Sequence, residues 1–174
     1  MSESTFIISA MTPSDVEAAT HMRLASWLDT YVNEEHGISK DWIEERNKQQ
    51  STPEALERRK KMLSGGDNKG FVAKDKNGTI IGAAMPYRDA KGIQHVGSLY
   101  VAKTWHGRGV GGALMQEIIH WSDPSQPIVL GVVTYNERAK AFYRKWGFSE
   151  IPGSETLFDN KLPEIMMTRK GDKQ

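Results

Sequence analysis

Residues 98–114, SLYVAKTWHGRGVGGAL, run from an apolar segment through a glycine-rich turn into an amphipathic segment. Tyr100 and Val101 are residue types that suit a pleated strand. Glycine lets the backbone bend sharply and come close to a ligand. Four glycines stand within six residues here, Gly107, Gly109, Gly111 and Gly112. Beyond them, apolar residues recur at helical spacing, at Leu114, Ile118 and Trp121. The stretch therefore predicts a strand, a tight turn and a helix.

The start of this predicted helix has few side chains around it. Its backbone N–H groups are open to a ligand, and the positive end of the helix dipole favours an anion, most often phosphate. A turn without any ligand is the simpler alternative, but each added glycine costs chain entropy, which favours a binding loop. Gly107, Gly109 and Gly112 also satisfy the G-x-G-x-x-G fingerprint, so a dinucleotide-binding oxidoreductase is a second interpretation.

A second segment, residues 136–148, reads NERAKAFYRKWGF. A dinucleotide site needs an acidic residue about 20 residues past the glycines, whereas the predicted strand at residues 128–133 runs into Thr134, Tyr135 and Asn136. The two segments together resemble the GNAT family of N-acetyltransferases. The first resembles its acetyl-CoA loop, Gln/Arg-x-x-Gly-x-Gly/Ala after Leu-Tyr-Val, except that His106 stands where the family has Gln or Arg. The second matches Asn-x-x-Ala-x-x-x-Tyr-x-x-x-Gly-Phe.

The resemblance, which is closest over residues 71–148, implies acetyl-CoA as the co-substrate. It implies that backbone N–H groups of residues 108–113 hold the pyrophosphate, and that Leu99 and Val101 offer strand N–H and C=O groups to the pantetheine arm. The cofactor-binding residues that it implies are Leu99, Tyr100, Val101, His106, Gly107, Arg108, Gly109, Val110, Gly111, Gly112, Ala113, Asn136, Ala139 and Tyr143.

Acetyl transfer to an amine needs proton transfers, because an alkyl ammonium with a pKa near ~10.4 must lose a proton before it attacks. The match to the family tyrosine makes Tyr143 the candidate acid for the departing thiolate; a purely packing or CoA-contacting tyrosine is the alternative. His95 is a candidate base, since its ordinary pKa suits the role. It shares a strand face with Leu99 and Val101 if no bulge intervenes. Further candidate bases are Glu34, Glu35 and Tyr31.

Periodicity and turn signals predict an α/β (α+β) fold with a mixed central sheet of about six to seven strands flanked by helices, which is the GNAT architecture. Strands are predicted at residues 6–8, 71–73, 79–85, 93–101, 128–133 and 165–168. Helices are predicted at residues 12–31, 39–48, 53–63, 110–121 and 138–146. Residues 1–174 form a single domain in this interpretation. It has acceptor-side helices in residues 1–70, an acetyl-CoA-binding core in 71–148 and a C-terminal strand and tail in 149–174.

The chain of 174 residues has a net charge of +1 and no cysteine. Near-neutral charge favours neither a nucleic acid nor a membrane surface as a partner. The lack of cysteine excludes disulfides, thiolate metal sites and a cysteine acyl-enzyme, and no metal site is predicted. The N-terminus does not resemble a signal peptide and no stretch approaches transmembrane length, so the sequence predicts a cytoplasmic protein. The sequence is compatible with a homodimer and does not define the oligomeric state.

The acceptor is predicted from charge. Residues 1–50 hold nine acidic and four basic side chains, a net charge of −5, against +6 in the remainder. Because the family resemblance places the acceptor pocket along the first helix, the predicted substrate-binding residues are Trp27, Tyr31, Glu34 and Glu35. Acidic walls concentrate cations, so the acceptor is predicted to be a small cationic, polyamine-like amine. The alternatives are a protein or peptide amine as acceptor and a non-catalytic acyl-CoA-binding module.

Overall fold

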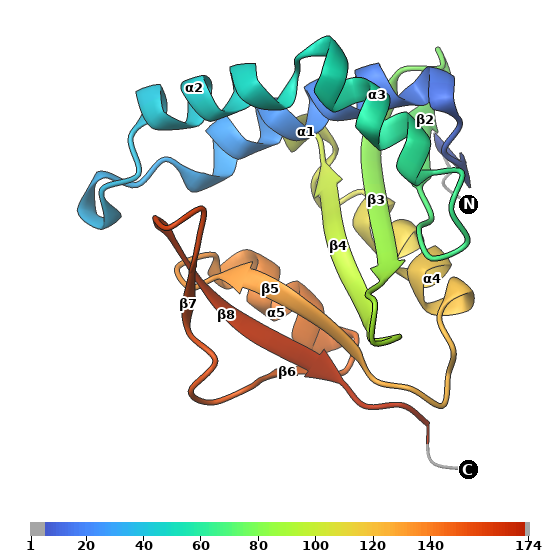
Figure 1. Cartoon of the computed structure of the whole chain (residues 1–174), viewed down its shortest axis with the longest axis vertical. Coiled ribbons are helices and arrows are strands. Elements are labelled where there is room, and N and C mark those ends of the chain that lie inside the picture. The colour runs from blue at the N-terminus through green and yellow to red at the C-terminus, as the bar shows by residue number, and fades with distance from the viewer. Residues whose placement is uncertain (1–5, 173–174) are drawn as a thin grey trace.

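The computed structural model describes residues 6–172. Its strands are β1 (Phe6–Ala10), β2 (Phe71–Asp75), β3 (Ile80–Arg88), β4 (Gln94–Val101), β5 (Ile128–Val133), β6 (Phe148–Glu150), β7 (Thr156–Phe158) and β8 (Leu162–Arg169). Its α-helices are α1 (Val16–Tyr31), α2 (Lys40–Gln50), α3 (Pro53–Met62), α4 (Val110–Trp121) and α5 (Glu137–Lys145). The predicted fold class is confirmed, with a mixed sheet between two sets of helices (Figure 1).

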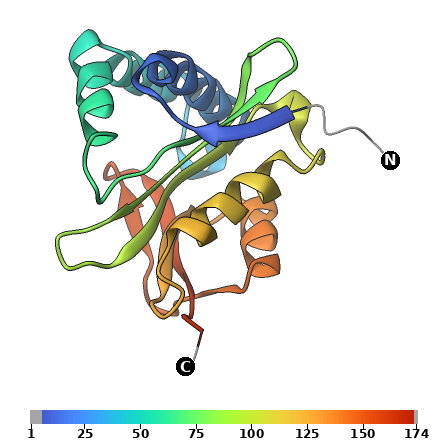
Figure 2. The same ribbon diagram turned by 90° about the vertical axis from the view of Figure 1, so that its right-hand side faces the viewer.

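In the described part of the chain, the sheet has eight strands in the order β1-β2-β3-β4-β5-β8-β6, and β7 pairs with β8. This exceeds the expected six to seven, because β6 and β7 are three residues long and too short to show a period. The first four strands are antiparallel neighbours, β4 and β5 are parallel, and β5 pairs antiparallel with β8. The helix α1 packs on β3 and β4 from one face and α4 packs from the other. Figure 2 shows α4 and α5 together on that second face.

Local signals fix where the helices begin. Thr12 and Asp15 form a capping box in a short 3₁₀ turn that leads into α1, and the Thr12 N–H donates to Asp15 Oδ2 at 2.9 Å. Ser39 caps α2 by accepting from the Trp42 N–H, and Thr52 caps α3 by accepting from the Ala55 N–H. Such caps satisfy backbone donors that have no acceptor within the helix. These predicted starts are confirmed.

The strands β4 and β5 separate soon after they meet. Within residues 6–172 they pair only through Gln94 with Ile128 and His95 with Val129. Beyond that point, β4 follows β3 and β5 follows β8, and the gap between them widens (Figure 1). On the far side of the gap, Trp27 packs in one buried cluster with Val133 and Leu162, so α1 is joined to β5 and β8 across the opening.

Candidate active site

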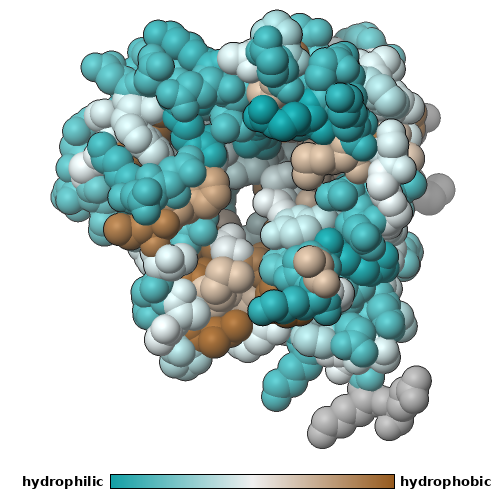
Figure 3. Space-filling model, viewed as in Figure 1, coloured by the Kyte–Doolittle hydropathy of each residue, from teal (hydrophilic) through white to brown (hydrophobic). Residues whose placement is uncertain are grey.

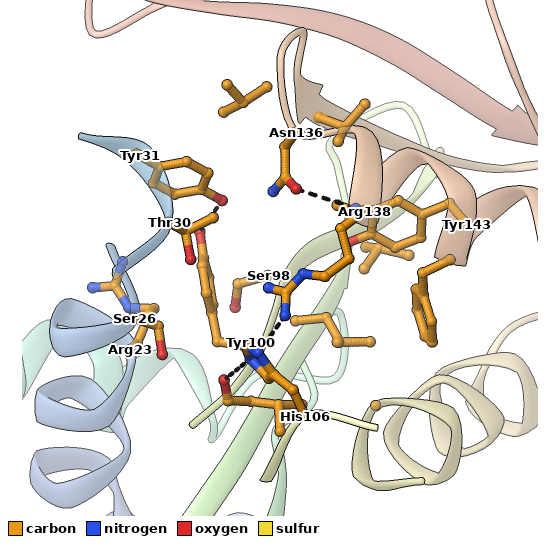
Figure 4. Close-up of a pocket in the computed structure, with 18 of the residues that line it drawn as sticks. Arg23, Ser26, Thr30, Tyr31, Ser98, Tyr100, His106, Asn136, Arg138 and Tyr143 are labelled. Carbon is orange, nitrogen blue, oxygen red and sulfur yellow. Dashed lines mark hydrogen bonds between the residues drawn. The ribbon is translucent and has the colours of Figure 1, made fainter. Parts of the chain in front are cut away.

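The separation of β4 from β5 opens a cavity of about 740 Å³. Its walls come from α1, α2, β4, the glycine turn, the first turn of α4, β5, α5 and the segment from β7 to β8. Figure 3 shows the molecule hollowed at this place, below the N-terminal helices. In the close-up, Arg23, Thr30 and Tyr31 reach the cavity from α1, and Arg138 and Tyr143 reach it from α5, with Tyr100 between them (Figure 4).

The glycine turn delivers the start of α4 to this cavity. Gly107 and Gly109 have φ of +74° and +86°, a region that L side chains rarely adopt. Apart from the adjoining residues, no heavy atom of residues 6–172 lies within 4 Å of the place where either Cβ would stand. The first hydrogen bond within the helix runs from the Ala113 N–H to Gly109 O, at 3.0 Å. The N–H groups of Val110, Gly111 and Gly112 therefore have no acceptor inside α4 and face an open space.

The edge of β4 is the second backbone surface in the cavity. The Ala102 N–H donates to Ile81 O on β3, and backbone groups alternate in direction along a strand. The N–H groups of Leu99 and Val101 therefore point to the opposite edge, where β5 has moved away. His106 Nε2 donates to Val101 O at 2.9 Å, which removes that carbonyl from the open edge.

Most of the residues implied by the family resemblance line the cavity together. They are Leu99, Tyr100, Val101, His106, Gly107, Gly109, Val110, Gly111, Gly112, Asn136, Ala139 and Tyr143. Arg108 and Ala113 do not line it. The Arg108 guanidinium is exposed and lies 5.2 Å from the Trp105 ring, while the Ala113 N–H is used inside α4. The cation at this end is instead Arg138, whose Nη1 hydrogen bonds to His106 Nδ1.

The start of α5 explains the second sequence motif. Asn136 is the N-cap of the helix, and its Oδ1 accepts from the Ala139 N–H at 3.1 Å. One turn later, Tyr143 is buried edge-on against Phe142 and Phe148. Burial, together with the nearby Tyr100, raises the pKa of the Tyr143 hydroxyl, because the charged phenolate is poorly solvated there. Tyr143 is therefore a neutral O–H group at the cavity wall.

Aromatic residues of α1 meet β4 on the acceptor side. Trp27 Nε1 donates to the Tyr100 hydroxyl at 2.9 Å, and the Tyr31 hydroxyl lies 3.4 Å from the same oxygen. The Tyr135 hydroxyl in turn donates to Tyr31 O at 2.7 Å. Burial raises the pKa of Tyr31 well above its usual value, and the neighbouring Tyr100 adds to the rise. Trp27 and Tyr31 line the cavity as a rigid, uncharged wall.

His95 does not reach the cavity, so it is not available as the base. The register of β3 and β4 shifts between Ala84 and Pro86, which places an extra residue in β4 between Val96 and Leu99. Such a bulge reverses the facing of all later side chains. His95 therefore lies on the face opposite to Leu99, where its ring stacks on Tyr87 and Nε2 lies 3.0 Å from Asp89 Oδ2.

Glu34 and Glu35 are also outside the cavity. Both are exposed in the 3₁₀ turn Glu34–His36, beyond the end of α1. The carboxylate that does line the cavity is Glu164, which sits on β8 opposite Val133. Burial raises its pKa, the negative charge of Asp159 raises it further, and Arg46 acts in the opposite direction. The predicted strand at residues 165–168 began one residue too late to include it.

Gly131 makes room for the Glu164 carboxylate. A Cβ on Gly131 would lie 2.9 Å from Glu164 Oε2, closer than the two atoms can approach.

Within residues 6–172, no group of three or more His, Asp or Glu side chains is arranged to hold a metal ion. None of the helices in that range is long and apolar enough to cross a membrane.

Comparison with known proteins agrees with this geometry. A model of the Acetyltransferase (GNAT) family matches residues 25–148. A Mycobacterium tuberculosis protein named a probable N-acetyltransferase is 30% identical over 159 residues, covering 85% of this chain and 82% of that protein. The solved PaiA N-acetyltransferase of Thermoplasma acidophilum, in complex with coenzyme A, shares the fold with a TM-score of 0.76 at 20% identity, over 95% of this chain and 98% of that one. The ribosomal-protein-S18-alanine N-acetyltransferase of Escherichia coli gives 0.66 at 17% identity, over 97% and 96%.

Proposed function

Because the chain belongs to the GNAT acetyltransferase family, we propose that it transfers the acetyl group of acetyl-CoA to a primary amine, by direct attack in a ternary complex. One observation carries the proposal: the unpaired first turn of α4 and the open edge of β4 face the same cavity. The first is a site for an anion and the second is a site for an amide-containing chain. A molecule that combines a pyrophosphate with an amide-containing arm fits both.

The cavity also meets the spatial needs of this co-substrate. The backbone at Gly107 and Gly109 has open space where side chains would stand, so a pyrophosphate can approach the N–H groups of Val110, Gly111 and Gly112. Arg138 adds a positive charge beside them. When bound, acetyl-CoA supplies a thioester carbonyl carbon for the amine to attack.

The backbone of β4 stabilises charge during this attack. The carbonyl oxygen becomes more negative as the amine adds, and a fixed N–H donor lowers the energy of that state. The N–H groups of Leu99 and Val101 are the donors at the open edge. They are held in place by the β3–β4 pairing on the other side of the strand, so they need no rearrangement when the charge develops.

Two side chains move the protons. Glu164 is the base we propose, since its carboxylate faces the cavity and burial raises its pKa toward the working range of a base. It takes the proton that the acceptor amine must lose. Tyr143 is the acid, because it lines the same cavity and its hydroxyl stays protonated. It donates a proton to the departing sulfur.

The cationic, polyamine-like acceptor predicted from the sequence depended on Glu34 and Glu35 lining the pocket. Both lie outside the cavity, so the proposal here is limited to a primary amine, and the charge of the acceptor is argued below. Membership of the family sets aside the dinucleotide-binding oxidoreductase.

The experiment is an assay of acetyl-CoA-dependent thiol release over a panel of amines, together with the thermal shift caused by acetyl-CoA. The expected result is a rise in the melting temperature with acetyl-CoA, and thiol release that depends on at least one amine. A thermal shift without thiol release for any amine would indicate a non-catalytic acyl-CoA-binding module. Absence of both would overturn the proposal.

A further inference from the structure

The acceptor end of the cavity carries two arginine side chains that the proposed proton transfers do not use. Arg23 comes from α1 and Arg46 from α2, and both line the cavity. One nitrogen of each guanidinium, Nη2 of Arg23 and Nη1 of Arg46, is closed to solvent and has no hydrogen-bond partner among residues 6–172. Buried donors in folded proteins nearly always have an acceptor. Asn47 Oδ1 is a third buried polar atom without a partner in the same range, and its Nδ2 donates to Leu24 O. The two arginine nitrogens are donors that an acceptor group of a ligand could satisfy.

Arg46 is fixed at the cavity wall rather than free in solvent. Its side chain is 10% exposed, and its Nε donates to Asp159 Oδ2 at 2.6 Å. The guanidinium carbon lies 3.9 Å from the centre of the Trp27 ring and 5.1 Å from the centre of the Phe158 ring. Two aromatic faces and one carboxylate orient the plane of the guanidinium. The edge that carries Nη1 is left for another partner.

Arg23 adds a second positive charge at the same place. It lies one helical turn before Trp27 and forms no ion pair within residues 6–172. Burial lowers the pKa of Arg23, and the nearby Tyr100 acts in the opposite direction. The positive charge of Arg46 lowers this pKa further, because the two guanidinium groups repel each other. Arg59 on α3 also faces both groups, although Gln50 satisfies two of its nitrogens. An anion between these arginines would relieve both the repulsion and the missing hydrogen bonds.

The negative groups at this end do not balance the arginines. Asp159 is paired with Arg46 Nε. The raised pKa of Glu164 means that its carboxylate holds a negative charge less readily than an exposed glutamate does. The remaining polar groups of the α1 wall are the hydroxyls of Ser26, Thr30 and Tyr31, which are neutral. Figure 4 shows Arg23 on this wall, across the cavity from Asn136 and Tyr143. The positive end of the cavity is thus opposite to the proposed cofactor side.

We propose that the acceptor is a small amine that also carries an oxyanion, a carboxylate or a phosphonate, and that Arg23 and Arg46 bind this oxyanion while the amine faces Glu164. This substrate class rests on the acetyl transfer proposed above. The planar, forked donors of arginine match the oxygens of carboxylates and phosphonates in pairs. A polyamine has no group for the arginines to bind, and its second cation would be repelled by them.

The experiment compares matched acceptors in the thiol-release assay with the wild-type protein. The probes are several L-amino acids, each beside its methyl ester, with 2-aminoethylphosphonate as the phosphonate probe and spermidine as the cationic probe. We expect kcat/KM for the best carboxylate or phosphonate amine to exceed that of its neutral partner and of spermidine by at least about 10-fold. A comparison of kcat/KM between the amino acids and 2-aminoethylphosphonate identifies which oxyanion the protein prefers. Preference for an ester or for spermidine would overturn the proposal.

The arginines are tested by Arg23→Met and Arg46→Met, which keep the length of the side chain and remove its charge. Each is expected to lower kcat/KM for the anionic amine by about 10-fold or more, with KM for acetyl-CoA unchanged. Arg46→Lys should restore part of the loss. The control is Arg58→Met, an exposed arginine of α3 outside the cavity, which should behave as wild type. Equal activity of both Met variants and wild type toward the anionic amine would contradict the proposal.

A failure of acetyl transfer itself is distinguishable from a failure of this assignment. If no amine releases thiol, calorimetric titration of the CoA-bound protein with the same probes still measures recognition of the oxyanion. Binding of an amino acid or of 2-aminoethylphosphonate, lost in Arg46→Met and absent for the methyl esters, would support the arginine site while removing the transfer activity. Equal binding of amino acids and esters, or no binding of either, would remove the arginine site as well.

Discussion

Replacing Gly109 by aspartate is the most direct test of the proposed pyrophosphate cradle. Gly109 is the N-cap of α4 with φ +86°, and in the described part of the chain only atoms of the adjoining residues lie within 4 Å of its Cβ position. The steric cost is therefore confined to the backbone. Because aspartate adopts the left-handed region more readily than most residues, we expect the free energy of unfolding to fall by about 1 kcal/mol.

The effect on acetyl-CoA is expected to be larger. The new carboxylate would compete for the N–H groups of Val110, Gly111 and Gly112 and would place a negative charge beside the pyrophosphate. Two unit charges about 5 Å apart, at an effective dielectric constant of about 20, repel by about 3 kcal/mol. That energy corresponds to roughly 100-fold in Kd. Calorimetric titration with acetyl-CoA measures this change.

Gly153→Asp is the matched control. Gly153 also has a positive φ, +76°, and the same open space around its Cβ position among residues 6–172, but it lies in the turn between β6 and β7, away from the cavity. It should show a similar loss of stability in urea unfolding and wild-type affinity for acetyl-CoA. A Kd for acetyl-CoA in Gly109→Asp within about threefold of wild type, with both variants folded by circular dichroism, would refute the cradle.

Three further changes have defined outcomes. Tyr143→Phe should lower kcat by about 100-fold with little change in KM for acetyl-CoA; wild-type kcat would reduce Tyr143 to a packing residue. Glu164→Gln should abolish the acidic limb of the pH profile of kcat/KM, because the wild-type base loses function as the pH falls through its raised pKa; a persisting limb would place the base elsewhere. Asp15→Asn should lower the free energy of unfolding by about 1 kcal/mol at pH 7. Burial alone would raise the pKa of Asp15, but hydrogen bonds from Lys74 and Thr12 lower it overall. Its contribution is therefore present above its unfolded pKa of about 3.9 and is lost as the pH falls toward the folded value, which urea unfolding at several pH values measures.

The glycine turn and the start of α5 were predictable because their signals are local. The N-cap of α4 has a left-handed backbone, which favours glycine at position 109, and the N-cap of α5 favours a side-chain acceptor such as Asn136. Each residue type therefore indicates the backbone conformation at its own position. The helix caps Ser39 and Thr52 are local in the same sense, and the helices that they begin are confirmed. These features require no knowledge of what packs against them.

The proposed base shows where local reading fails. Strand alternation would place His95 beside Leu99 if β4 were regular, but the bulge before Leu99 inverts every later side chain. No residue type marks this bulge uniquely, since it arises from the way β3 and β4 pair. Glu164 is brought into the cavity by pairing with β5, more than 30 residues earlier in the chain. Its role depends on non-local pairing that the periodicity of a single strand does not contain.

The charge of the acceptor side shows the same limit in a different form. Counting charges over residues 1–50 gives an acidic segment, yet a count does not say which side chains face inward. Glu34 and Glu35 lie in solvent, as charged residues usually do, and such groups contribute little to a site they do not line. Arg23, by contrast, stands four residues before Trp27 and therefore on the buried face of α1. A charge at helical spacing within an apolar face is costly unless it has a partner, so the position of Arg23, rather than the net charge of the segment, is the basis of the anionic acceptor that we propose.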